Sequence, residues 1–436
     1  MAESHNTKNE GNDHVQLTAQ CLCKAHSFTA TVPRTALPLQ ACACHCTSCR
    51  HMLGAMYSTD TLWPGDPAVI RHCSTLKTYR FSDRLQVLFC STCSSPLFWD
   101  FPAGARDGHD GKAAEPAGAD KSQYGVFTGA LLSSIKNPGP GPLIELAEHI
   151  VLDDTMDGGL SPILRRPNDT VHAKRQPATR WAGRQLLSKE IPEGEDHWPE
   201  PPAADWRNSE VREIPLWCHC RGVNLVYRCQ EAYREHAAMD ADKLPDTVDP
   251  LTRKTVVETD ACTFCRTSCG TDFMHWTFSA LRHLRYAHED AKTHQQHQKD
   301  PEASTAGAFS LPATLLDLYA AVTAPREDRD PRLGTLAVYC SSEGRKRYFC
   351  SNCSACVFFA SDANHDVIHV AMGLLDSPDG ARAEGSFGWL LGGRVQEKDD
   401  IKGTWRETWL DSHETESEAW RKARKFPEWW KIMGWG

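Results

Sequence analysis

The chain has 436 residues, of which 40% are hydrophobic and 19 are Cys, and its formal net charge is −9. This length allows about two to four domains. The acidic balance argues mildly against nucleic acid as a partner, because phosphate binding normally uses a basic surface, although a local basic patch is compatible with this average. No apolar run approaches the roughly 20 residues that span a bilayer, and the polar N-terminus lacks the apolar core of a signal peptide. We therefore expect a cytoplasmic protein without a membrane partner. In that reducing compartment its cysteines should bind metal instead of forming disulfides.

The first part of the chain predicts short strands that carry cysteine pairs. Residues 1–14 are polar and predict a disordered tail, and residues 15–160 form a first predicted zinc-binding module. Its opening CxC, Cys21 and Cys23, falls on an expected strand, where residues two apart point to the same face. Later strand-like segments of this module lie at 68–70, 76–81, 85–89, 124–132 and 149–152.

The second part repeats this pattern with longer loops. Residues 161–213 are rich in Pro and charge and predict a linker, with one short helix near 179–187. Residues 214–395 form a second predicted zinc-binding module. Its expected strands lie at 223–227, 336–339 and 367–372, and its insertions lie at 230–255 and 281–330, the latter with a helix at 313–322.

The end of the chain, residues 396–436, predicts a helical tail. Thr415 and Glu418 have the spacing of a capping box, which marks the start of a helix. Trp429 and Trp430 are expected to pack on the body of the protein, because Trp is a common core anchor. Together the segments predict a mainly β protein of two tandem zinc-binding modules with a linker and a C-terminal helix.

Each module has four cysteines with the spacing of a structural zinc site. A CxC near the start of the module is followed, across a long loop, by a CxxC. Structural zinc takes four ligands, and the coupling of metal binding to folding suits a small β module. The alternative is a set of ordinary buried thiols, which the repetition of the spacing disfavours. The two predicted ligand sets are Cys21, Cys23, Cys90 and Cys93, and Cys218, Cys220, Cys350 and Cys353.

The first module also contains a CxCxxC, formed by Cys44, Cys46 and Cys49. Three thiolates leave one position of a zinc ion open, as in a reactive zinc site. Their charge leaves the ion at net −1, which suits it to hold a substrate thiol as thiolate. A bound thiolate would need a nearby cation, and Arg50 is the candidate substrate-binding residue. The alternative is a closed structural site that Cys42 or His45 completes.

The counterpart of this motif in the second module is altered. Asp260 stands where the first module has Cys44, and Cys262 and Cys265 follow it. Asp binds zinc through oxygen, so these three residues are candidate ligands of a Cys₂Asp site, with Cys269 as another third ligand. The alternative is a metal-free copy kept for stability or partner binding, because a site short of soft ligands often loses zinc.

These motifs, in this order, resemble the glutathione-dependent formaldehyde-activating enzyme family, also called the centromere protein V-like family. The resemblance rests on Cys-x-Cys, Ala-Cys-His-Cys-x-x-Cys-Arg and Phe-Cys-x-x-Cys within residues 15–160, and it covers 214–395 more loosely. It implies short antiparallel sheets, a structural zinc on the CxC and CxxC cysteines, and a second zinc on the CxCxxC cysteines. The family usually has Gly where Ser94 and Ser354 stand here, a difference expected to alter a turn but not the metal.

The resemblance also implies carbon–sulfur lyase chemistry, the reversible joining of glutathione and formaldehyde to S-hydroxymethylglutathione. Zinc would hold the glutathione sulfur through Cys44, Cys46 and Cys49, the predicted catalytic residues, so the expected partner is a small-molecule thiol. The alternative is a non-catalytic, zinc-stabilised module that binds a protein partner at the long segments 161–213 and 281–330. An open pocket at the three cysteines favours the first function, and a closed site favours the second.

Overall fold

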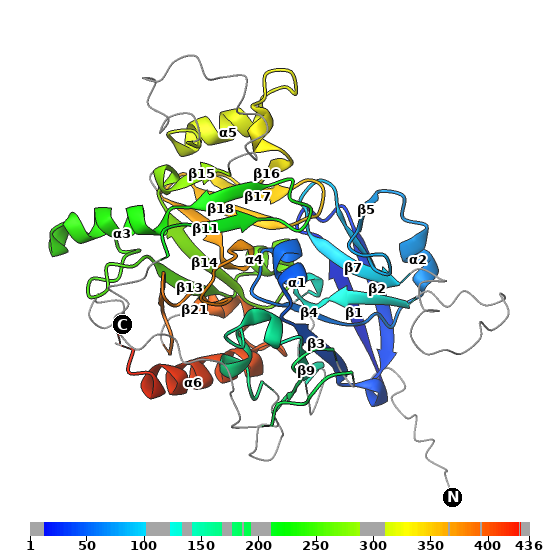
Figure 1. Cartoon of the computed structure of the whole chain (residues 1–436). Helices are drawn as coiled ribbons and strands as arrows, with labels where there is room; N and C mark the ends of the chain where they lie inside the picture. The colour runs from blue at the N-terminus through cyan, green and yellow to red at the C-terminus, as the bar shows by residue number, and fades with distance from the viewer. Residues whose placement is uncertain are drawn as a thin grey trace, which may run out of the picture.

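The computed structural model describes residues 13–101, 123–132, 142–167, 177–184, 187–192, 211–287, 310–364, 367–392, 395–426 and 428. Strands dominate these residues, which confirms the prediction of a mainly β fold. No helix among them is long and apolar enough to cross a membrane. We call the described residues up to 192 the N-terminal half and those from 211 the C-terminal half. Each half contains one small sheet and one eight-stranded sheet (Figure 1).

In the N-terminal half, β1 and β2 pair as a separate two-stranded sheet. Their side chains alternate between exposed and buried, as the period of a half-buried strand requires. The large sheet has the order β10-β9-β3-β4-β8-β7-β6-β5. The elements are β1 (His14–Gln20), β2 (Ser27–Pro33), β3 (Leu39–Cys44), α1 (Thr47–Leu53), β4 (Ser58–Leu62), α2 (Pro67–Arg71), β5 (Leu76–Arg80), β6 (Gln86–Cys90), β7 (Pro96–Phe101), β8 (Gln123–Phe127), β9 (Ile144–Ile150) and β10 (Thr179–Arg180).

In the C-terminal half, the small sheet has the order β11-β12-β15. The large sheet has the order β16-β17-β18-β19-β14-β13-β20, and β21 also pairs with β13. The elements are β11 (Ile214–Trp217), β12 (Asn224–Tyr227), α3 (Cys229–Ala238), β13 (Val256–Asp260), α4 (Thr263–Cys269), β14 (Met274–Ser279), β15 (Leu284–Tyr286), α5 (Leu315–Thr323), β16 (Leu336–Ser342), β17 (Arg345–Cys350), β18 (Cys356–Ser361), β19 (Ile368–Ala371), β20 (Gly388–Trp389), β21 (Val395–Gln396) and α6 (Glu407–Ala423).

The two large sheets pass through corresponding strands in the same order. The N-terminal sheet runs β5-β6-β7-β8-β4-β3-β9, and the C-terminal sheet runs β16-β17-β18-β19-β14-β13-β20. In the N-terminal sheet the short helix α1 connects the antiparallel neighbours β3 and β4, and β9 pairs in parallel with β3. In the C-terminal sheet α4 connects the antiparallel neighbours β13 and β14, and β20 pairs in parallel with β13. One buried hydrophobic cluster includes residues from both halves.

The halves meet through two matching contacts at the ends of α1 and α4. These helices end at Gly54 and Gly270, whose φ values of 79° and 76° lie in the left-handed region that favours glycine. Gly373 N donates to Gly54 O at 3.0 Å, and Gly129 N donates to Gly270 O at 3.1 Å. A Cβ on Gly54 would lie 2.0 Å from Cys356 O, so the backbones approach too closely for a side chain there.

Two local predictions were wrong and one was confirmed. The expected strand at 68–70 belongs to α2, because Asp66 caps this helix by accepting from Ala68 N and Pro67 stands at its first turn. The segment near 179–187, expected to be a helix, begins with the short strand β10, which pairs with β9 and extends the sheet. The helix expected at 313–322 is α5.

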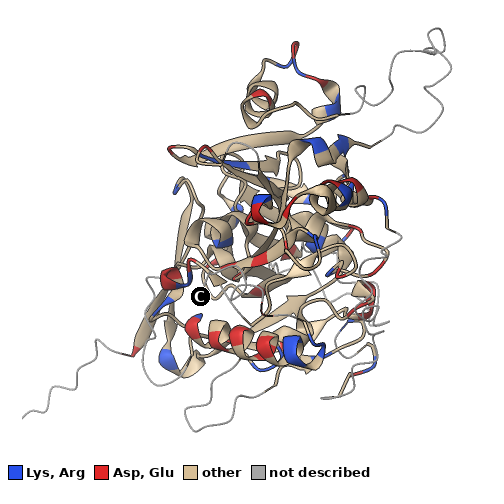
Figure 2. Cartoon of the chain, turned by 90° about the vertical axis from the view of Figure 1, so that its left-hand side faces the viewer, with Lys and Arg blue, Asp and Glu red and all other residues tan. Residues whose placement is uncertain are grey.

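The C-terminal helix α6 begins earlier than predicted. Thr415 lies inside it and donates from Oγ1 to Asp411 O at 2.7 Å, so the predicted capping box does not start the helix. Acidic residues lie along α6 and basic residues gather at its C-terminal end (Figure 2), the order that the helix dipole favours. Trp429 and Trp430 lie outside the described residues.

Candidate metal centres and an adjoining pocket

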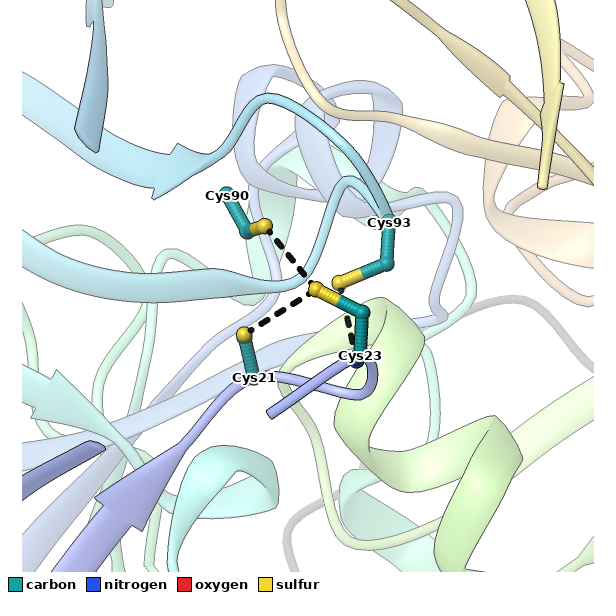
Figure 3. A group of neighbouring side chains, drawn as sticks. All are labelled: Cys21, Cys23, Cys90 and Cys93. Atoms are coloured by element: carbon teal, nitrogen blue, oxygen red, sulfur yellow. Dashed lines mark hydrogen bonds between the residues drawn. The ribbon is translucent and has the colours of Figure 1, made fainter. Parts of the chain in front are cut away.

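Four sulfurs of the N-terminal half converge between the small sheet and the β6–β7 turn (Figure 3). They belong to the predicted ligands Cys21, Cys23, Cys90 and Cys93, and all lie within 4.8 Å of one another. Cys23 Sγ is 3.6 Å from Cys21 Sγ and 3.5 Å from Cys90 Sγ. A tetrahedron with Zn–S bonds of about 2.3 Å has edges of about 3.8 Å. The donor type and the spacing therefore fit a structural zinc.

The second predicted set, Cys218, Cys220, Cys350 and Cys353, converges in the same way. Cys220 Sγ is 3.6 Å from Cys218 Sγ and 3.5 Å from Cys350 Sγ. These separations match those of the first set, so the same ion fits both.

The CxC of each set lies in a turn, so the predicted place of Cys21 and Cys23 on a strand was wrong. β1 ends just before Cys21, and Lys24 N donates to Cys21 O at 2.9 Å to close the turn. The matching bond in the C-terminal half joins Arg221 N to Cys218 O at 2.7 Å. The turn also directs His26 N toward Cys21 Sγ at 3.3 Å, and an amide donor stabilises a thiolate.

The serines that follow each CxxC keep the turn that glycine favours. Ser94 and Ser354 have φ values of 64° and 68°, in the left-handed region. Ser94 N donates to Cys90 O at 2.9 Å, and Ser354 N donates to Cys350 O at 3.0 Å. The expected alteration of the turn is therefore not found. Ser94 Oγ also donates to Ser354 O at 2.8 Å between the halves, a bond that glycine could not make.

The CxCxxC residues Cys44, Cys46 and Cys49 meet where β3 leads into α1. Their sulfurs lie within 4.8 Å of one another, and among the described residues no further Cys, His, Asp or Glu joins the group. Cys46 caps α1 and accepts from Cys49 N at 3.3 Å. Hydrogen bonds with Cys44 and Cys49 lower the pKa of Cys46 to about 3, and those with Cys44 and Cys46 raise the pKa of Cys49. The group therefore holds one thiolate readily, and a metal ion must displace the other protons.

His45 and Cys42, the two alternative fourth ligands, form hydrogen bonds with other residues. His45 Nε2 lies 2.9 Å from His149 Nδ1, and both rings are buried. Burial raises the pKa of the Cys42 thiol, which hydrogen-bonds to Glu148. The geometry thus gives three ligands from this motif, not four.

Arg50, the predicted substrate-binding residue, is only 3% exposed. Its Nη2 donates to Thr47 Oγ1 at 3.2 Å. Burial lowers the pKa of Arg50, while Asp157 and Asp154 act in the opposite direction, as does the charge on Cys46. The side chain is therefore a buried cation beside the thiolates.

Two carboxylates that the sequence did not predict lie on the same sheet face as Cys44. Cys42 pairs with Asp60 on β4 and with Glu148 on β9. Residues paired across strands share a face, as do residues two apart on one strand. Asp60, Cys42 and Glu148 therefore form a row about 7 Å from Cys44 along β3. Only the register of three strands, distant in sequence, reveals this row.

Each of these carboxylates has an indole partner. The Trp99 indole hydrogen-bonds to Asp60, and Trp181 Nε1 donates to Glu148 Oε2 at 3.1 Å. Gly125 makes room for the first indole, because a Cβ there would lie 1.9 Å from Trp99 Cε2. Burial raises the pKa of Asp60 to about 7, and the Trp99 bond opposes that rise. Asp60 is therefore poised to exchange a proton near neutral pH.

The altered motif of the C-terminal half also comes together. The ligand atoms of Asp260, Cys262 and Cys265 lie within 4.8 Å of one another. The Cys265 thiol donates to Asp260 Oδ2 at 3.1 Å, and Cys262 caps α4 by accepting from Cys265 N at 3.1 Å. Cys269, the other suggested ligand, instead donates to Arg266 O at 3.7 Å. A pocket of about 630 Å³ adjoins this centre.

A family model described as glutathione-dependent formaldehyde-activating enzyme matches residues 16–113. This segment contains all seven cysteines of the two N-terminal groups, which are the four-cysteine set and the CxCxxC. Neither the curated proteins nor the solved structures gave a match to the chain. The family match supports glutathione-related formaldehyde chemistry in the matched segment, and its sulfur groups are compatible with zinc.

Proposed function

We propose that the chain is a zinc-dependent carbon–sulfur lyase that acts on glutathione–aldehyde adducts of the S-hydroxymethylglutathione type. The observation that carries this proposal is the group of Cys44, Cys46 and Cys49, which offers three sulfur ligands and no fourth among the residues described. The group lies inside the segment that matches the formaldehyde-activating family. A cytoplasmic location fits this proposal, because glutathione keeps thiols reduced there.

The tandem arrangement is part of the same proposal. The matching strand orders of the two large sheets and the paired contacts at Gly54 and Gly270 support two modules of one ancestry. Each module would hold one structural zinc, and each would have a second centre, with sulfur ligands in the first module and Asp260, Cys262 and Cys265 in the second. We place the end of the first module beyond residue 160, because β10 extends its sheet.

The charges around the three-cysteine centre of Cys44, Cys46 and Cys49 suit a thiolate ligand. Zinc bound there would hold the glutathione sulfur as thiolate. Arg50 lies buried beside Cys46 and offsets the negative charge that the cysteines and the incoming sulfur concentrate. We assign Arg50 this electrostatic role in substrate binding.

We assign the proton transfer to Asp60. When the adduct breaks down, its hydroxyl proton passes to the Asp60 carboxylate, the C=O bond of the aldehyde forms, and the C–S bond breaks with its electron pair on sulfur. In the reverse direction Asp60 returns the proton to the new hydroxyl oxygen. Its position on the face of Cys44 and its pKa of about 7 support this role.

The test compares the catalysed and uncatalysed exchange of formaldehyde with glutathione. Purified zinc-loaded protein is mixed with glutathione and ¹³C-formaldehyde, and exchange between free and bound formaldehyde is followed by NMR. We expect Cys44→Ser to lose the acceleration but keep the structural zinc and the melting temperature. Cys340→Ser is the matched control, because Cys340 is exposed and belongs to none of the ligand groups described. A Cys44→Ser protein as fast as the wild type would sink the proposal.

The second candidate, a module that binds a protein partner, has one observation in its favour. Leu187 and Leu316 are 77% and 74% exposed, one in each of the predicted segments 161–213 and 281–330. Single exposed leucines are common on protein surfaces. This candidate would gain support if the exchange assay showed no acceleration by the wild type.

A further inference from the structure

The pocket of about 630 Å³ opens on the centre of the C-terminal half. Its floor is a row of side chains straight across the large sheet, where paired residues on neighbouring strands share a face. The row consists of Arg347 on β17, Phe359 on β18, His369 on β19 and Phe278 on β14. The three candidate ligands of the centre also line the pocket, so a metal ion there would be accessible to a bound molecule.

Arg347 brings to this centre a cation from the sheet, at a position where the N-terminal half has none. It is 6% exposed, and its Nη1 lies 3.4 Å from Cys265 Sγ. Its guanidinium carbon also lies 5.0 Å from the centre of the Phe359 ring. The corresponding residue of the N-terminal half is Val87, since both stand three residues before the first cysteine of a CxxC.

This cation changes which ligands the centre can accept. A divalent metal with two thiolates and one carboxylate carries a net charge of −1. Arg266 is buried and follows Cys265 as Arg50 follows Cys49, so it brings the local sum to zero, and Arg347 raises the sum to +1. One bound anion therefore returns the sum to zero, whereas the three-cysteine centre has Arg50 but no arginine on β6, so an anion would bring that centre to −1. Beyond Arg347 the floor carries no charge, because Phe359 and Phe278 are apolar and burial lowers the pKa of His369 to about 3, which keeps its ring neutral.

Four further carboxylates line the pocket and limit the charge of its ligand. Glu258 accepts a 2.9 Å hydrogen bond from a side-chain amide on β21, and Asp400 accepts one of 2.6 Å from the first backbone amide of α4. Asp246 and Glu397 are exposed. Together they add negative charge to the pocket, so a ligand with two carboxylates is repelled more strongly than a ligand with one.

We propose that this pocket binds a small monocarboxylate with an apolar body. The carboxylate lies between the Arg347 guanidinium and a divalent metal on Asp260, Cys262 and Cys265, and the apolar body lies on the aromatic floor. Arg345, two residues away on the same face of β17, is a second cation for the ligand. The proposal needs metal at this centre but not lyase activity in the N-terminal half.

Calorimetric titration of the zinc-loaded full chain with benzoate tests the proposal. All titrations use a chain that carries Cys46→Ser. This substitution removes a ligand of the three-cysteine centre, so benzoate binding at that centre cannot contribute to the measured heat. We expect one benzoate per chain, and about tenfold weaker binding of terephthalate, which has a second carboxylate at its far end. Arg347→Met should weaken benzoate about tenfold or more. Arg326→Gln, an exposed arginine outside the pocket, should leave it unchanged.

Two further variants separate loss of the ligand site from loss of metal. Asp260→Ala should remove one zinc per chain and abolish benzoate binding. Arg345→Gln does not touch the metal ligands, so zinc content should be unchanged while benzoate binds about threefold weaker. The proposal is overturned by absence of benzoate binding, by equal binding of terephthalate, by unchanged binding in Asp260→Ala, or by unchanged binding in both arginine variants. None of these results depends on the exchange assay.

Discussion

Asp60 shows how the environment of one residue can set a pH dependence. Burial holds its pKa at about 7, so the carboxylate is the minor form below that pH and the major form above it. A general base must be deprotonated. We therefore expect kcat/KM for adduct breakdown to rise through a midpoint near pH 7. The pH profile of formaldehyde release measures this rise.

Asp60→Asn is the matching variant, since it keeps the shape of the side chain and removes the titration. Loss of a general base typically lowers rates by about 10²- to 10⁴-fold, and the rise through pH 7 should disappear with it. Zinc content serves as the control for an intact centre. If Asp60→Asn keeps the wild-type profile, the proton acceptor is another group, and Glu148 in the same row is the next to test.

Residues of the metal centres differed in how far the sequence could predict them. The spacing of cysteines was enough to predict two groups in the N-terminal half and the four-cysteine set in the C-terminal half, and the structure brings each of them together. Asp60 and Glu148 were missed, because they face the centre only through the pairing of β3 with β4 and with β9. Pairing between distant strands leaves no local mark in sequence.

At the scale of elements, the predictions failed where tertiary contacts decide the boundaries. Thr415 and Glu418 have a capping pattern, yet α6 begins at Glu407. The residue before that start, Arg406, is fully buried together with Asp272, and its Nε donates to Asp272 Oδ1 at 2.7 Å. The helix therefore starts where an ion pair anchors it, and a local sequence pattern could not predict that partner.

This ion pair joins α6 and the C-terminal half to the N-terminal half. Arg406 Nη2 also donates to Thr128 O at 2.6 Å and to Leu131 O at 2.9 Å. Arg406→Met should lower the free energy of unfolding by about 3–5 kcal/mol, because Asp272 is left charged and buried without its cation. Thermal and denaturant unfolding measure the loss. Asp272→Asn in the same chain should recover part of it, and a double variant no more stable than Arg406→Met would contradict the ion-pair explanation.

At the scale of the whole molecule, the halves share one buried core and meet at matching glycines. Gly54→Ala tests how strongly this contact couples them. Gly403→Ala is the matched control, because Gly403 also has a left-handed φ of 73° but no atom lies within 4 Å of its Cβ position. Both variants incur about 1 kcal/mol for the left-handed conformation, but only Gly54→Ala adds a contact of 2.0 Å with Cys356 O in the other half.

We therefore expect Gly54→Ala to destabilise the protein by at least about 2 kcal/mol more than Gly403→Ala, because overpacking costs about 1–3 kcal/mol and the opposing atom belongs to rigid backbone. Denaturant unfolding followed by Trp fluorescence measures both. Since the core is shared, the wild type should unfold in one transition, and Gly54→Ala should shift that transition or split it into two. If the two substitutions lower the free energy of unfolding equally, the clash at Gly54 is relieved by separation of the halves at no cost in free energy. The shared core would then not couple the folding of the two halves.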